Sequence, residues 1–405
     1  MTNEEQLSSM LCAKGLPDKD ESSAMRTLRL TGNSLFRGDL ANSMRDVINA
    51  ACKSKAPTYI DRYERDTKLI VTNLLAAAFQ WEWLGLGTRI FKDSYLAKMG
   101  LSRRRVEHIV RALIQLGYVV KGRGGYLNHA NPSKSRSSEY YPSEKLIQLG
   151  AKMLYECVGD FDDYEPYEWE GDQRWDVNEA RNIKIIRDYN EFMRSHSWAQ
   201  KAPTVRKLLD TPFTGGRVYT PYQTIVNRRV PIRRNTHLDG EPLVECDFSA
   251  NHPYMLAKLT GNEFRADFYS VIAEGSKCDK TVVKAVITAA IGCPSLSKAH
   301  ETRFSLQDKR GIAGRDVEKV ITTASDAFPW LKDHNLLFHN KGVYMQWLEG
   351  EIAMRMFAYA VKEEIPMINV HDAYAVNERH TNTVWAAMNR YREEVLDEYK
   401  LKLAL

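Results

Sequence analysis

The sequence predicts an α+β protein, in which an α-rich N-terminal domain precedes a domain built from an antiparallel sheet with helices. Apolar residues recur at helical spacing over 66–84 and again after residue 102. Two apolar segments, 242–247 and 365–376, have the length and pattern of strands. With 405 residues, of which 43% are hydrophobic, the chain is long enough for two or three domains with cores of their own.

Charge is distributed unevenly along the chain. Residues 1–150 contain 23 Lys/Arg and 15 Asp/Glu, residues 181–240 contain 12 and 4, and residues 156–180 contain ten acids and one Arg. Two basic zones favour a polyanionic partner, although ordinary solvated helix faces give the same pattern. The six cysteines form no Cys-x-x-Cys pair, and no apolar run approaches the roughly 20 residues of a membrane span. We therefore expect a soluble, cytoplasmic protein without a membrane partner.

We expect four regions. Residues 1–58 form a polar N-terminal region, and residues 59–130 form the α-rich domain. Residues 131–180 combine a Ser/Pro/Asn-rich linker with an acidic, aromatic segment that serves either as a lid or as a tether. Residues 181–405 form the larger domain.

Basic residues gather at two places in the α-rich domain. A helix over 66–84, a short helix and turn at 92–102, and a helix that Ser102 can cap precede a Gly-rich hairpin at 116–127. This order resembles a winged helix-turn-helix, whose second helix and hairpin contact DNA. The resemblance implies DNA contacts from Arg103, Arg104, Arg105, Lys121 and Arg123. Winged helices also bind proteins, so a protein partner remains the alternative.

Each strand segment of the larger domain delivers one aspartate. Leu-Val-Glu-Cys-Asp-Phe-Ser-Ala-Asn-His-Pro at 243–253 places Asp247 at a strand-to-helix corner. The segment 365–376 is a β-hairpin in outline, with His371 and Asp372 in its turn. Carboxylates are the ligands that hard divalent ions prefer, so two aspartates that meet in space can hold a Mg²⁺ pair for phosphoryl transfer.

A helix is expected between the two aspartates. Lys280 and Lys284 are four residues apart and share one face of this helix, where a nucleoside triphosphate would relieve their mutual repulsion. Asp247-Phe-Ser, Lys280-x3-Lys284 and Val370-His-Asp372, preceded by Gly-Gly-Arg-Val-Tyr at 215–219, resemble in order the motifs of family A DNA polymerases and single-subunit phage RNA polymerases. The resemblance covers roughly residues 200–405, about half of the chain.

The resemblance implies a polymerase-like palm with reduced helical fingers, in which Asp247 and Asp372 hold two Mg²⁺ ions, with Mn²⁺ as an alternative ion. It implies catalytic roles for Lys284 and His371 beside these aspartates. Nucleotide contacts are implied for Lys280, Lys284, His252, Phe248 and Ser249, and template or primer contacts for Arg217, Tyr219, Arg228 and Arg229.

Three positions depart from the family pattern. His252 stands where family DNA polymerases have a glutamate, which leaves the choice between ribo- and deoxynucleotides open. Ile291-Gly292 replaces a Tyr-Gly pair, and Ala373 follows Asp372 as in the RNA polymerases.

The function that the resemblance implies is template-directed nucleotidyl transfer by a compact DNA polymerase or primase-polymerase of the kind carried by mobile genetic elements. Its partners would be DNA template and primer, nucleoside triphosphates and replication accessory proteins. Two alternatives remain open. A catalytically degenerate palm would leave a winged-helix replication initiator or transcriptional regulator, and the same carboxylates also occur in metal-dependent phosphohydrolases.

Overall fold

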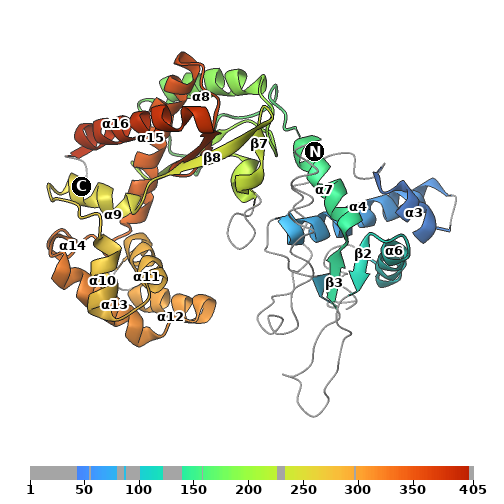
Figure 1. The fold of residues 1–405 in the computed structure, drawn as a ribbon, viewed down its shortest axis with the longest axis horizontal. Coiled ribbons are helices and arrows are strands. Elements are labelled where there is room, and N and C mark those ends of the chain that lie inside the picture. Colours follow the sequence, from blue (N-terminus) through green and yellow to red (C-terminus); the bar gives the residue numbers. More distant parts are fainter. Residues whose placement is uncertain are drawn as a thin grey trace, which may run out of the picture. The chain divides into compact units, whose positions relative to one another are not determined.

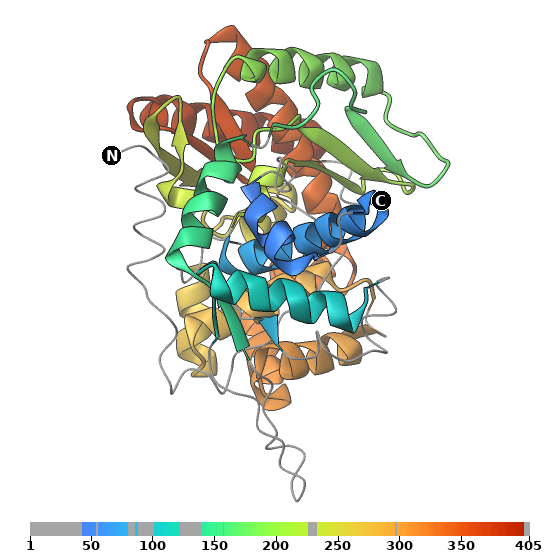
Figure 2. The same ribbon diagram turned by 90° about the vertical axis from the view of Figure 1, so that its right-hand side faces the viewer.

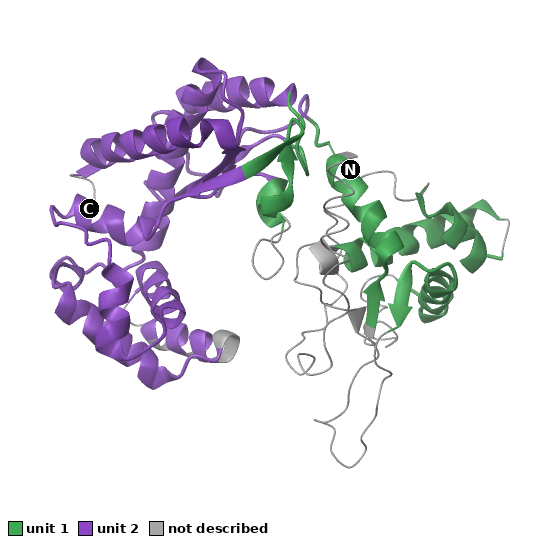
Figure 3. Cartoon of the chain, in the orientation of Figure 1, with its two compact units in different colours: residues 1–160, 196–202, 221–243 green, residues 161–195, 203–220, 244–405 purple. Residues whose placement is uncertain are grey.

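The computed structural model describes residues 43–53, 56–79, 86–87, 101–121, 139–156, 158–225, 233–295 and 298–400. Helices and mostly antiparallel strands alternate along these residues, which confirms the α+β class. The chain divides into two compact units, shown in Figure 3. Unit 1 comprises residues 1–160, 196–202 and 221–243, and unit 2 comprises residues 161–195, 203–220 and 244–405.

Unit 1 contains four described helices and a small sheet (Figure 1). The helices are α3 (Arg45–Ala51), α4 (Pro57–Phe79), α6 (Arg103–Gln115) and α7 (Glu144–Glu156), and the strands are β1 (Leu86–Gly87), β2 (Val119–Lys121) and β3 (Glu139–Pro142). The sheet order is β1-β3-β2, and β3 is antiparallel to both neighbours. Helix α6 buries Val106, Ile109, Val110 and Leu113, as its 3.6-residue pattern predicts, whereas Ile114 is exposed.

The pairing of β2 corrects the predicted linker. Its partner is β3, because Lys121 lies opposite Tyr140 and Val119 opposite Pro142. Residues 139–142, predicted as part of a linker, are therefore a strand, and α7 follows directly. The predicted short helix before Leu101 and the hairpin tip beyond Lys121 lie outside the described residues.

Unit 2 contains two sheets and nine of the described helices. The first sheet has the order β4-β5-β6, from β4 (Tyr167–Glu170), β5 (Val205–Leu209) and β6 (Gly215–Tyr219). The second has the order β7-β8-β10-β9, from β7 (His237–Leu238), β8 (Glu241–Asp247), β10 (Ala373–Asn377) and β9 (Met367–Val370). Strand β7 and the start of β8 belong to unit 1, and β8 continues into unit 2.

The helices of unit 2 form two sets. Helices α8 (Glu179–Arg194), α9 (Asn251–Leu259), α15 (Lys341–Lys362) and α16 (Thr381–Tyr399) accompany the strands, and α8 packs along α15 (Figures 1 and 2). Helices α10 (Phe268–Ser276), α11 (Lys280–Gly292), α12 (Ala299–Arg310), α13 (Gly314–Ala327) and α14 (Trp330–Asp333) gather in a separate helical group (Figure 1).

The acidic, aromatic segment is folded into unit 2 as a strand with packed side chains. Its strand β4 pairs in parallel with β5, and Trp175 donates a hydrogen bond from Nε1 to the Leu209 carbonyl at 2.8 Å. The Tyr167 hydroxyl donates to Asp176 at 2.6 Å. Residues 167–176 therefore extend the first sheet and pack against it.

Helix α15 packs closely on β6. A Cβ added at Gly350 would lie 1.9 Å from the Gly216 carbonyl oxygen, so only glycine allows this approach. The buried Arg206 on β5 pairs with Glu351 of the same helix at 2.9 Å. Buried charges remain in a folded protein when they are paired, and this pair fixes the rotation of α15 against the first sheet.

Candidate active site

The two predicted aspartates lie at neighbouring strand ends. Asp247 is the last residue of β8, and Asp372 lies in the two-residue turn between β9 and β10, where Val370 pairs with Ala373. His371, which precedes Asp372, has a φ of 61°, the left-handed conformation that such a tight turn requires. The side-chain amide of Asn369 donates to the His371 carbonyl at 2.9 Å and holds the turn.

The negative charge of Asp247 acts on Asp372. The pKa of Asp372 is raised to about 7, first by burial and then by the negative charges of Glu349 and Asp247. Because β8 and β10 are neighbours in the sheet, residues 125 positions apart in the sequence converge. The two aspartates therefore lie on adjacent strands, which is the arrangement that the predicted shared cation site requires.

A third acid at this place was not predicted from the sequence. Glu349 on α15 is buried, and its two oxygens contact His252 Nε2 at 2.8 Å and Arg217 Nε at 2.5 Å. The amide of Asn251 lies 3.4 Å from the oxygen that contacts His252. Burial by itself would raise the pKa of Glu349, but His252 and Arg217 outweigh it and lower the pKa to about 2. Glu349 is therefore ionised at neutral pH.

Several other predicted residues join this cluster. The rings of Tyr219 and His371 meet edge to face, with centroids 6.4 Å apart. Arg217 Nη2 lies 3.4 Å from His252 Nε2, so β6 and α9 meet here. A cavity of about 10 Å³, room for one water molecule or a small ion, is lined by Phe248, Asn251, Glu349, Ile352, His371, Asp372 and Tyr374.

One residue of the helical group, Tyr269, interacts electrostatically with Asp372, and the sequence did not predict this. Tyr269 on α10 is buried, and burial together with the charge of Asp372 raises the pKa of Tyr269 to about 12, against a hydrogen bond with Thr288. Thr288 lies four residues after Lys284 on α11, on the same face of the helix. Lys284 is exposed, and Lys280 donates to the Ser270 hydroxyl at 3.2 Å.

The remaining predicted residues of this site contribute less. Ser249 is exposed between β8 and α9. Arg228 and Arg229 lie outside the described residues.

The basic residues of unit 1 differ in their surroundings. Arg105 donates to the buried carboxylate of Asp66 at 2.6 Å, which ties α6 to α4. Arg103 pairs with Glu107 one turn along α6, at 2.8 Å, in an exposed position. Arg104 and Lys121 are exposed, and Arg123 lies outside the described residues. The guanidinium of Arg105 is thus committed to the helix interface, whereas Arg104 and Lys121 face solvent.

The donor set at the aspartates fits a hard cation that completes its shell with other ligands. Within the described ranges, no group of three or more His, Cys, Asp and Glu side chains is arranged to hold a metal ion. Mg²⁺ is commonly bound by one or two carboxylates, with water and substrate phosphates as the other ligands. Asp247 and Asp372 provide two such carboxylates at a place where negative charge accumulates.

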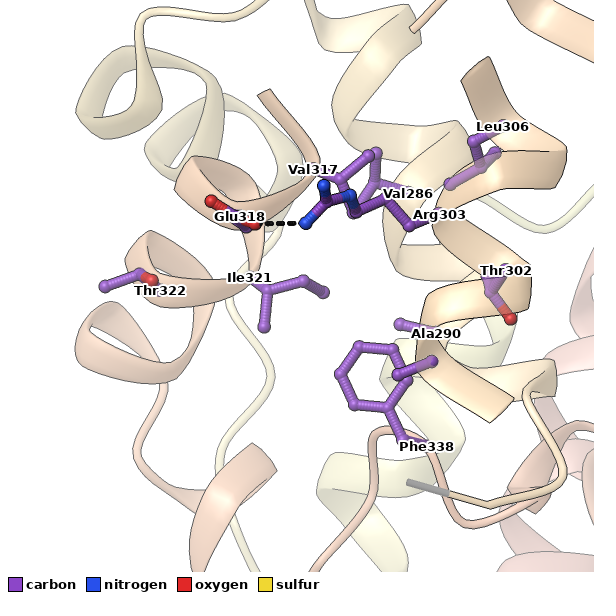
Figure 4. Close-up of a pocket in the computed structure, with 11 residues that line it drawn as sticks. Val286, Ala290, Thr302, Arg303, Leu306, Val317, Glu318, Ile321, Thr322 and Phe338 are labelled. Carbon is purple, nitrogen blue, oxygen red and sulfur yellow. Dashed lines mark hydrogen bonds and ion pairs between the residues drawn. The ribbon is translucent and has the colours of Figure 1, made fainter. Parts of the chain in front are cut away.

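A larger cavity than the one beside Asp372 lies in the helical group. It has a volume of about 260 Å³ and lies between α11, α12 and α13 (Figure 4). Val286 and Ala290 line it from the buried face of α11, and an ion pair between Arg303 and Glu318 borders it at 2.5 Å. Lys280 and Lys284 are exposed and do not line this cavity.

Across the part of the chain that the structure describes, no helix combines the length and the apolar character that a membrane span requires. The sequence matches no protein-family model, and the search of curated proteins finds no match either.

Proposed function

We propose that the chain is a template-directed nucleotidyltransferase whose reaction centre is built from Asp247 and Asp372. The observation that carries this proposal is the position of the two carboxyl groups on neighbouring strands of one sheet, Asp247 at the end of β8 and Asp372 in the turn that leads into β10. Two carboxylates on neighbouring strands and two exposed lysines on one face of α11 suit a divalent cation and a polyphosphate, which are the components of phosphoryl transfer. The motif order in residues 200–405 supports the same assignment.

In this proposal, each group acts through position and charge. Bound Mg²⁺ would neutralise the triphosphate and activate the attacking 3′-hydroxyl, and Asp247 and Asp372 would hold it. Lys280 and Lys284, exposed on one face of α11, bind the phosphates of the incoming nucleotide. His371 positions the primer end from its turn beside Asp372.

The substrate strands and the sugar are assigned to the neighbouring cluster. Arg217 and Tyr219, side by side on β6, contact template or primer. His252 and Phe248 border the sugar of the incoming nucleotide.

Unit 1 is proposed to bind duplex DNA as a winged helix. The supporting observations are the sheet order β1-β3-β2 beside α6, and the exposure of Arg104 and Lys121 at the helix start and on the adjacent strand. Phosphate contacts from exposed arginine and lysine dominate affinity for DNA. This assignment gives the chain a module that holds DNA independently of the reaction centre.

Primer extension tests the catalytic proposal. Wild-type protein with Mg²⁺ or Mn²⁺ should extend an annealed primer, and supplying deoxy- or ribonucleotides separately reports the product type. Asp372→Asn should reduce the rate by at least about a thousandfold, because it removes a charge that acts on the transition state. Asp326→Asn is the matched control, since Asp326 is exposed on α13 of the same unit. Omitting the primer from the same assay reports priming.

Equal extension by wild type and Asp372→Asn would remove Asp372 from the reaction. Duplex binding without any extension by the wild type would instead favour a replication initiator or regulator that acts through unit 1.

A further inference from the structure

Two acids, Glu349 and Asp372, act on the guanidinium group of Arg217. Its Nε donates to Glu349 at 2.5 Å. Burial works against the charge of Arg217, but Glu349 and then Asp372 raise the pKa of the guanidinium. Glu349 and Asp372 line the same small cavity, so Asp372 lies beside the carboxylate that Arg217 binds directly.

The contacts around Glu349 hold its carboxylate in place to accept the hydrogen bond from Arg217. One Glu349 oxygen contacts His252 and Asn251, both on α9, so the side chain cannot rotate away without breaking those contacts. The other oxygen is left for Arg217 on β6. The charged groups that surround Arg217 thus come from α15, α9 and the β9–β10 turn.

A guanidinium without Glu349 would have a second carboxylate within electrostatic reach. Arginine carries five donors in a planar fork that matches a carboxylate, so Arg217 would turn toward Asp372. An ion pair there would neutralise the carboxylate and compete with a divalent cation for its oxygens. The cost of leaving Arg217 half-buried without a partner drives the same movement.

We propose that Glu349 is a positioning residue that holds Arg217 away from Asp372 and so leaves the Asp372 carboxylate available to a divalent cation. This inference rests on the proposed function, because it assumes that a cation binds at Asp372. It assigns to α15 a role in metal affinity that does not require Glu349 to be a ligand, because this role depends only on the contacts of its two oxygens with His252 and Arg217.

A double-mutant cycle on Mn²⁺ affinity tests it. Mn²⁺ titrations followed by electron paramagnetic resonance compare wild type, Glu349→Gln, Arg217→Gln and the double variant, above the pKa of Asp372 near 7. Glu349→Gln should weaken Mn²⁺ binding about tenfold, since a cation beside a carboxylate changes its proton affinity by about 1–3 pKa units. Arg217→Gln should strengthen binding about tenfold in the Glu349→Gln background, and by less than about threefold in the wild-type background.

Additive charge effects would give a different result. If Arg217→Gln strengthens Mn²⁺ binding equally in both backgrounds, Glu349 and Arg217 act independently and the proposal is overturned. Absence of Mn²⁺ binding by the wild type overturns it as well. Glu349→Asp, which keeps the charge but shortens the reach, carries the same cycle if Glu349→Gln does not fold. Thermal melting of each variant reports folding.

The cycle also separates this inference from the polymerase proposal. A coupled cycle in a protein that does not extend primers retains the role of Glu349 and rejects the polymerase. An additive cycle in a protein that extends primers does the reverse.

Discussion

Replacing Asp372 with Asn should stabilise the protein in the absence of divalent cations, and the gain should depend on pH. Folding raises the pKa of Asp372 from its ordinary 3.8 to about 7. The unfolded chain therefore loses this proton at lower pH than the folded chain, and the free energy of unfolding falls as pH rises between the two values. A difference of about 3 pKa units corresponds to about 4 kcal/mol.

The gain from Asp372→Asn follows from these two pKa values. Below pH 3.8, Asp372 is protonated in both the folded and the unfolded wild type, and it costs little stability. Above about pH 7, Asp372 is ionised in both states, and its full destabilisation of the folded state is present. The variant should exceed wild type by about 2 kcal/mol near pH 5 and by about 4 kcal/mol near pH 8. Urea denaturation with a chelator, followed by tryptophan fluorescence at both pH values, measures the two differences. Asp326→Asn should show neither.

Two results would refute this reasoning. A gain that is the same at both pH values would mean that Asp372 titrates normally, so that neither burial nor Asp247 acts on it. Mg²⁺ offers an independent check, because a ligand that binds only the folded state raises its stability. Added Mg²⁺ should therefore stabilise the wild type and leave Asp372→Asn unchanged; equal stabilisation of both proteins would place the cation elsewhere.

Three further predictions concern DNA binding by unit 1 and the packing of each unit. Arg104→Glu should weaken duplex binding and flatten its salt dependence without loss of stability, whereas Arg105→Ala should cost about 3 kcal/mol because it leaves the buried Asp66 carboxylate with the exposed Arg65 alone. Duplex titrations at several salt concentrations and thermal melting distinguish the two variants, and unchanged binding by Arg104→Glu would indicate a protein partner. Gly350→Ala should destabilise unit 2 by more than about 3 kcal/mol, since its Cβ would lie 1.9 Å from a carbonyl oxygen. Melting of this variant at the wild-type temperature would contradict the close packing of α15 on β6.

Local patterns were sufficient for the elements that carry Asp372 and the two lysines. The predicted hairpin at 365–376 is confirmed as β9 and β10, and the predicted helix after Lys280 is confirmed as α11. Each has one repeating period and clear end signals over a short stretch. The pairing of two strands has no such local signal. Strands β2 and β3 pair although residues 122–138 separate them in the sequence, and the local pattern of residues 139–142 therefore predicts a linker.

Glu349 could not be assigned from sequence for the same reason. Its partners His252 and Arg217 are 97 and 132 residues away, so neither contact leaves a spacing pattern. One composition signal was present. Trp347-Leu-Glu-Gly-Glu-Ile352 places two acids in an apolar run of a helix, and acids are almost never fully buried unless they are paired. That signal predicts buried ion pairs but not which arginine completes them.

The surroundings of Glu349 lower its pKa, whereas the surroundings of Asp372 raise its pKa. Glu349 has Arg217 and His252 within hydrogen-bond distance, so it is ionised despite complete burial. Asp372 faces Glu349 and Asp247 instead, against walls that include Phe248 and Tyr374, and it holds its proton up to about pH 7. Arg217 and His252 place positive charge beside Glu349. A divalent cation would place positive charge beside Asp372 in the same way. The cluster therefore contains one acid with positive partners and one without, and on the proposed function this difference directs a divalent cation to Asp372.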